Sequence, residues 1–263
     1  MVAGKNKIIG KLKNFKRYYT AMSIDTKINI LDKMLDLTMK RINDHMKKQN
    51  HVSKHIIFSD DIASKVILKK LTLIDEKIMC NILGKGINSP DITNPIMYLK
   101  KHFRNIWGTF EYTISNSDIE ESEKFLKDSK FGASGSILSQ YYNIFKKISE
   151  KKYIQHIIIC DFSKELFGGC DYHKNKNAEV YENIIKNSIP SYIESIDSVS
   201  TYFGLTVWFP YLGVDVLREI ENFTMDQLFH DGVGEYPIRR IAKDINVPGE
   251  IKIEEKEVIN LVC

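Results

Sequence analysis

The segment that decides the fold spans residues 55–68 and has the sequence HIIFSDDIASKVIL. Its first residues, 55–58, are mostly apolar and have the length of a short buried strand. A Ser-Asp-Asp turn follows, and the apolar residues Ile62, Val66 and Leu68 then indicate a helix. The sequence therefore predicts a strand, a tight loop and a helix in direct succession.

The loop between this strand and this helix has the position of a phosphate site but not its residues. A helix that begins directly after a strand offers free backbone N–H groups and the positive end of its dipole, and both attract phosphate. This loop carries Asp60 and Asp61 where small residues would let a phosphate approach. Ser59 and the two aspartates are also good residues for capping the helix. We therefore expect a nucleotide-site scaffold that has lost its binding chemistry.

Apolar runs and helical patterns alternate around this segment. We expect further strands at residues 77–83, 109–114 and 154–160, and helices at residues 25–46, 97–107, 118–127 and 137–148. This alternation predicts an α/β fold, with a parallel sheet of about four to five strands and helices on both faces. Segments 178–203, 214–222 and 237–245 have helical patterns only. We therefore divide the chain into a basic lead-in (1–24), an α/β domain (25–175) and a helical C-terminal lobe packed on it (176–263).

The composition is that of an ordinary globular protein. The chain has 263 residues, of which 43% are hydrophobic, and its formal net charge of +4 is too small to indicate a nucleic-acid partner by itself. Its cysteines are widely spaced and form no CxxC pair, so we expect no metal site. No apolar run approaches the ~20 residues of a membrane span. We therefore expect a cytoplasmic protein without a membrane partner.

The first 24 residues carry basic side chains and no acidic one. The basic residues are Lys5, Lys7, Lys11, Lys13, Lys16 and Arg17. We interpret the stretch as a solvated lead-in, because it has a single arginine and no cleavage site after an apolar core. An arm that binds nucleic acid and a targeting segment are the alternatives.

Three segments, in order along the chain, carry a resemblance to a known family. They are SDDIAS at 59–64, CDFSKELFGGC at 160–170 and DSVSTYFGLTVWFPYLG at 197–213. They are similar to the segments SGGLDS, GEGADELFGGY and DRMSMAHGVEVRFPFLD of asparagine synthetases. From about residue 16 to 256 the chain resembles the synthetase domain of that family, which belongs to the PP-loop ATP pyrophosphatases. A shorter similarity near the C-terminal end places Glu235 at the position of a catalytic lysine.

The resemblance implies a reaction and a set of site residues. Family members use ATP to adenylate a carboxylate, magnesium to neutralise the departing pyrophosphate, and ammonia to displace AMP. The nucleotide loops correspond to Ser59, Asp60, Asp61, Ser64, Gly168 and Gly169, and the catalytic candidates are Lys164, Glu165 and Lys256. Full-length members also carry a glutaminase domain whose nucleophile is a cysteine after the initiator methionine. Val2 stands at that position here, so we expect no glutamine hydrolysis by this chain.

The departures from the family pattern fall on the reacting groups. Two loop glycines correspond to Asp60 and Asp61, and the metal-binding aspartates correspond to Ala63 and Lys164. A carboxylate about 5 Å from a phosphate charge costs on the order of 3 kcal/mol at an effective dielectric constant of ~20. The substrate-binding positions of the third segment are Ser198, Thr206, Trp208 and Gly213, which also differ from the family residues.

These departures leave three hypotheses. The first is a pseudoenzyme without a cofactor that binds a protein partner or serves as a subunit of a complex. The second is a divergent amide-forming or adenylating enzyme that uses ATP, magnesium and free ammonia or another amine, with Lys164, Glu165 and Lys256 at its site. The third is a nucleic-acid-associated module that uses the basic residues before position 18.

Overall fold

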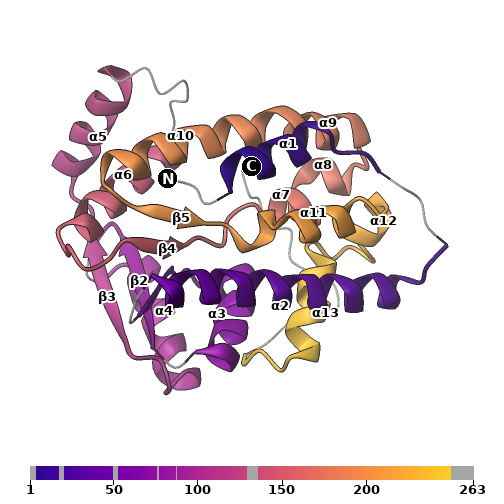
Figure 1. The fold of residues 1–263 in the computed structure, drawn as a ribbon, viewed down its shortest axis with the longest axis horizontal. Coiled ribbons are helices and arrows are strands. Elements are labelled where there is room, and N and C mark those ends of the chain that lie inside the picture. The colour runs from indigo at the N-terminus through magenta and orange to yellow at the C-terminus, as the bar shows by residue number, and fades with distance from the viewer. Residues whose placement is uncertain are drawn as a thin grey trace.

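The structure, a computed structural model, describes residues 4–17, 21–49, 53–75, 77–86, 88–128 and 136–249. These residues form a single all-parallel sheet of five strands with helices on both sides (Figure 1). The strands are β1 (Lys54–Ile57), β2 (Ile78–Gly84), β3 (Gly108–Thr113), β4 (His156–Ile158) and β5 (Thr206–Trp208). The predicted α/β fold with a parallel sheet is therefore confirmed.

The strand order is β3-β2-β1-β4-β5, with β1 in the middle. From β1 the chain builds the sheet outward on one side through β2 and β3, and then on the other side through β4 and β5. His55 and Ile56 of β1 pair with Ile157 and Ile158 of β4. The order reverses between these two strands, so the loops that follow them turn away from each other. In open α/β sheets, ligands bind in the crevice at this switch point.

The helices cover both faces of this sheet. They are α1 (Lys5–Lys13), α2 (Ile24–Lys48), α3 (Ile62–Ile74), α4 (Pro90–His102), α5 (Asn116–Asp128), α6 (Ser136–Ser149), α7 (Ser163–Phe167), α8 (Asp171–Lys174), α9 (Ala178–Asn183), the π-helical turn η1 (Ile184–Ser188), α10 (Ile189–Tyr202), the 3-10 turn η2 (Pro210–Leu212), α11 (Val214–Ile220), α12 (Met225–Leu228) and α13 (Tyr236–Asp244). Figure 1 shows strands β4 and β5 between α10 on one side and α2 on the other. No helix of the described residues is long and apolar enough to cross a membrane.

Helix α2 forms where its apolar period predicts a helix. Ser23 caps it by accepting a hydrogen bond from the Thr26 N–H at 3.2 Å. The buried residues of the helix include Ile28, Leu31, Leu35, Met39, Ile42 and Met46. Each fully buried aliphatic side chain of this size stabilises the fold by about 1.5–3 kcal/mol. Packing of one face therefore holds this helix against α11, α3 and α13.

The N-terminal segment differs from the expected solvated lead-in. Residues Lys5–Lys13 form α1, and its apolar face packs on α10 and α11. The buried apolar residues of this segment are Ile8, Ile9, Leu12 and Phe15. Lys5 and Lys11 form ion pairs with Asp197 and Glu221. The segment is thus a docked helix, because its apolar residues recur at helical spacing between the lysines.

The C-terminal third differs from the expected helical lobe at one point. Thr206, Val207 and Trp208 form β5 and pair with His156, Ile157 and Ile158 of β4. This part of the chain therefore completes the sheet instead of only packing on it. A strand of three residues is too short to show an alternating pattern, and neighbouring helices dominate the periodicity around it.

Candidate functional site

The loops that follow β1 and β4 flank the switch point of the sheet, beside a cavity. The cavity has a volume of about 620 Å³ and lies among α7, α10 and the start of α13. Its polar lining includes Asp61, Asp161, Lys164, Glu165, Tyr192 and Glu235. The structure therefore brings the first two family-like segments to one site, as the topology predicts.

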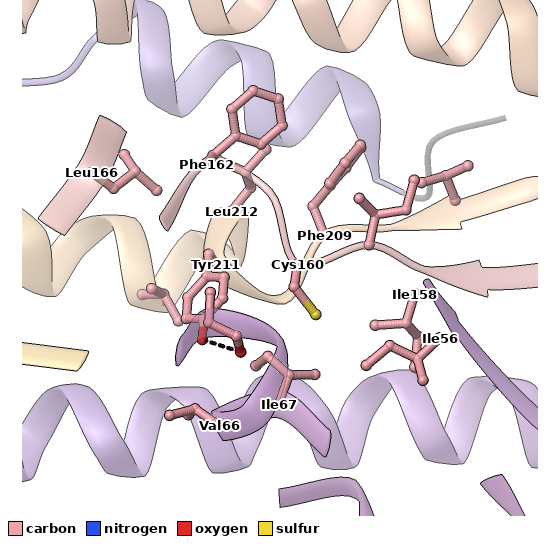
Figure 2. Packing of buried hydrophobic residues seen from close by; sticks show 14 of the residues in the cluster. Ile56, Val66, Ile67, Ile158, Cys160, Phe162, Leu166, Phe209, Tyr211 and Leu212 are labelled. Atoms are coloured by element: carbon pink, nitrogen blue, oxygen red, sulfur yellow. Dashed lines mark hydrogen bonds between the residues drawn. The ribbon is translucent and has the colours of Figure 1, made fainter. Parts of the chain in front are cut away.

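The third family-like segment reaches the same place through packing. The Tyr211 hydroxyl donates a hydrogen bond of 2.9 Å to the backbone carbonyl of Ala63, in the first turn of α3. The rings of Phe162 and Phe209 lie edge to face with their centroids 5.3 Å apart. Figure 2 shows Phe162, Phe209 and Tyr211 around Cys160, above Val66 and Ile67 of α3. These contacts are apolar or involve the backbone, so this segment supports the site without adding a reactive group.

The loop after β1 caps α3 with its own carboxylate. Asp61 Oδ1 accepts the Ser64 N–H at 2.7 Å, and the Ser59 hydroxyl donates to the other carboxylate oxygen. The Ser59 and Ser64 hydroxyls lie 2.9 Å apart and share a further hydrogen bond. The capping interpretation of Asp61 is therefore confirmed. The helix N-terminus that would attract a phosphate already holds a negative group.

Asp60 faces a different environment from its neighbour. Its carboxylate pairs with Lys65 at 2.7 Å, and the same ammonium lies 4.3 Å from the centre of the Tyr98 ring. Asp60 and Ser59 line a second cavity of about 750 Å³, which also contacts α4 and α6. The two adjacent aspartates therefore belong to different cavities, one on each side of the β1 loop.

The two glycines after α7 are required by packing. Gly168 has φ of +101°, and a Cβ placed on it would lie 2.2 Å from the Leu228 carbonyl oxygen. A Cβ on Gly169 would lie 2.7 Å from the Lys164 Cβ. Neither glycine belongs to the lining of the two cavities described above. Their conformation and close contacts explain these residues without a nucleotide.

Buried carboxyl groups converge on the switch-point cavity. Asp161 lies in the loop after β4 and accepts a hydrogen bond from the Tyr141 hydroxyl of α6, and burial raises its pKa to about 7. Glu235 accepts a hydrogen bond from the Ser163 hydroxyl, and burial raises its pKa. Burial also raises the pKa of Glu165. Burial therefore favours the protonated, neutral forms of these carboxyl groups, because a buried carboxylate loses the solvent that stabilises its charge.

Sequence reasoning identified only part of this group. Lys164 and Glu165 line the cavity, whereas Lys256 lies outside the described residues. Asp161 is not among the predicted site residues, although its position directly after the predicted strand at 154–160 is a usable signal. Glu235 adopts φ of +54° at the start of α13, and only the tertiary fold brings it to Ser163. The resemblance places Glu235 at the position of a catalytic lysine, and Glu235 does line the cavity, but the local sequence contains no signal for its contact with Ser163.

The residues present do not fit magnesium-bound ATP. The Asp61 carboxylate accepts the hydrogen bond of the Ser64 N–H at the start of α3, so this group is not free for a phosphate. Lys164 is at the position where the resemblance places a metal-binding aspartate. Across the parts of the chain that the structure describes, no cluster of three or more His, Cys, Asp and Glu side chains could hold a metal ion. The Asp61 cap and the Lys164 ammonium together disfavour a magnesium-bound triphosphate at this loop.

In comparisons with protein-family models and with curated proteins, the chain matches none. The resemblance to asparagine synthetases thus depends on the three segments described above.

Proposed function

We propose that this protein resembles asparagine synthetases in its scaffold, has lost ATP-dependent amide formation, and acts by binding another protein as part of a complex. The observation that carries this proposal is the 2.7 Å hydrogen bond from the Ser64 N–H to the Asp61 carboxylate. A phosphate at this helix would have to displace that carboxylate or lie beside it. Either arrangement places two negative groups at one helix end.

The charge around the loop makes ATP binding unfavourable. Each carboxylate about 5 Å from a phosphate charge costs on the order of 3 kcal/mol at an effective dielectric constant of ~20. A difference of about 1.4 kcal/mol changes an affinity tenfold. Asp61, Asp161 and Glu165 all line the cavity, and Lys164 supplies one opposing charge. Repulsion by one such carboxylate therefore weakens ATP binding on the order of a hundredfold.

Exposed apolar side chains at the opposite edge of the sheet support a protein partner. Trp107 precedes β3 and is 58% exposed, and Tyr153 precedes β4 and is 64% exposed. Leu73, near the end of α3 and before β2, is 67% exposed. The amino ends of parallel strands share one edge, so these residues lie away from the switch-point cavity. Tryptophan and tyrosine are the residues most enriched at the centres of protein interfaces.

The catalytic part of the proposal is tested by ATP–pyrophosphate exchange at millimolar ATP and magnesium, with aspartate and other carboxylic acids. We expect no exchange above background and no change in melting temperature with ATP. The double variant Asp60→Gly and Asp61→Gly is expected to raise ATP affinity at least tenfold, because it removes both charges. Ser23→Gly, which removes the cap of α2, is the matched control. Exchange by the unaltered chain would refute the proposal.

The partner is tested by purifying the tagged chain from its own cells. Alanine at Leu73, Trp107 and Tyr153 together is expected to release a stoichiometric partner. Met97→Ala, at an equally exposed residue of α4, is the control and is expected to retain it. A partner that stays bound to both variants places the interface elsewhere, and a chain that is monomeric in every extract contradicts partner binding.

A divergent adenylating enzyme remains the second candidate, because Lys164 and Glu165 do line the cavity. It requires ATP binding that weakens in Lys164→Ala. The nucleic-acid alternative is weaker, because Lys5 and Lys11 are paired with acidic residues of the protein body. It requires binding to RNA or DNA that falls steeply with salt concentration.

A further inference from the structure

The switch-point cavity combines a polar group of side chains with apolar walls. Its volume of about 620 Å³ is that of a site for a small organic molecule. The walls include the rings of Phe162, Tyr172 and Tyr192 and the aliphatic residues Ile184 and Ile189. A bare metal ion gains nothing from apolar walls, because it binds only to polar ligand atoms, whereas the body of an organic ligand would pack against them.

The charge of the cavity favours a positive ligand. Four carboxyl groups line it, from the β1 loop, from the loop after β4, from α7 and from the residue before α13. Lys164 is the single basic side chain among the lining residues. Asp161 and Glu165 are neighbours in the chain, and the fold adds Asp61 and Glu235 from distant segments. Burial raises the pKa of Asp161, Glu165 and Glu235, and a bound cation would stabilise their ionised forms by replacing the missing solvent.

A buried hydroxyl in the same cavity has no partner. Tyr192 Oη is inaccessible to solvent and has no hydrogen-bond partner in the described structure. Burial, together with the nearby Asp161 and Glu165, raises the pKa of Tyr192. A buried polar group without a partner costs about 1–3 kcal/mol, which a ligand that supplies the missing hydrogen bond would recover.

We propose that this cavity binds an organic cation, namely a protonated amine on an apolar body. The carboxyl groups of Asp161 and Glu165 would hold the ammonium, and Tyr192 would accept one of its hydrogens. The rings of Phe162 and Tyr172 would pack on the body and add a cation–π contribution. The inference does not depend on the loss of ATP chemistry, because amine binding is measured without a nucleotide.

The test uses calorimetry of the full chain with benzylamine and hexylamine as probes. Benzyl alcohol, hexanol and benzoate are the neutral and anionic controls. We expect the amines to bind at least tenfold more tightly than the alcohols, and benzoate not to bind. Equal binding of amines and alcohols would overturn the proposal. So would magnesium or manganese that binds more tightly than the amines and displaces them.

Variants assign the binding to this cavity. Glu165→Gln is expected to weaken amine binding at least tenfold, and Tyr192→Phe about threefold. Glu123→Gln and Asp60→Asn, in the second cavity, are the matched controls and are expected to leave the affinity unchanged. Melting temperatures identify any variant that fails to fold. If one of the two cavity variants does not fold, the other still tests the assignment. Amine binding that is equal in Glu165→Gln and Glu123→Gln would refute the assignment.

Discussion

The two loops at the switch point follow neighbouring strands but are stabilised in different ways. The loop after β1 satisfies its polar groups within six residues, through Asp61, Ser59 and Ser64. The loop after β4 depends on distant residues, since Asp161 binds Tyr141 and Ser163 binds Glu235. The first loop is therefore a local structure, whereas the second forms only when α6 and α13 are in place.

The carboxyl groups of the two loops also differ in how their charges are compensated. Asp60 has a lysine partner and Asp61 has a helix N–H, so neither aspartate needs a ligand. Asp161 and Glu165 lie in a cavity where burial raises their pKa, and Lys164 offsets part of their charge. The loop after β1, which has the most unusual sequence, therefore satisfies its own polar groups. The groups that could bind a ligand lie around the loop after β4.

The largest expected effect tests the dependence of the β4 loop on distant packing. Gly168→Ala is expected to cost more than about 3 kcal/mol in the free energy of unfolding, because its Cβ would overlap the Leu228 carbonyl and its backbone is left-handed. Gly204→Ala is the control, since Gly204 has φ of +70° with nothing within 4 Å of its Cβ. It is expected to cost about 1 kcal/mol. Urea unfolding measures both, and equal losses would show that the close contact does not matter.

A smaller effect concerns the pH dependence of stability. The folded-state pKa of Asp161 is about 7, above its ordinary value, so its contribution is present below about pH 4 and is lost as pH rises to 7. Asp161→Asn is therefore expected to be more stable than the unaltered chain at pH 8, on the order of 2 kcal/mol, and similar to it at pH 4.

Asp118→Asn is the control with the opposite sign. Hydrogen bonds from Ser115 lower the pKa of Asp118, so its contribution is present above the ordinary pKa and is lost as pH falls. This variant is expected to be less stable than the unaltered chain at pH 8. Denaturant unfolding at both pH values measures the two variants, and identical pH profiles for Asp161→Asn and the unaltered chain would mean that Asp161 keeps an ordinary pKa.

The smallest effect compares the adjacent aspartates of the β1 loop. Asp61→Ala is expected to cost about 1 kcal/mol, because it removes the cap of α3. Asp61→Asn is expected to cost less, because asparagine caps as well as aspartate does. Asp60→Ala is expected to change stability by less than about 0.5 kcal/mol, because its ion pair is partly exposed. Thermal unfolding can resolve this order, which would be reversed if the ion pair with Lys65 were the main support of the loop.

Local sequence was sufficient for the β1 loop and for α2. The change from apolar residues to Ser-Asp-Asp predicts the start of α3, and the buried face of α2 follows its period. It was not sufficient for β5, whose three residues gain their partners only from β4. The lysines of α1 indicate a solvated segment, but the side chains of Leu12 in this helix and of Phe15 just after it are fully buried.

The sequence by itself determined the α/β fold and the capped loop after β1, because strand and helix periodicity and helix capping depend on residues a few positions apart. It also placed Lys164 and Glu165 at the same edge as that loop. Only the tertiary structure decided that Asp60 and Asp61 line different cavities, and that Glu235 accepts a hydrogen bond from Ser163. These outcomes depend on where distant elements pack, and burial in that packing is what sets the charge and the pKa of the groups involved.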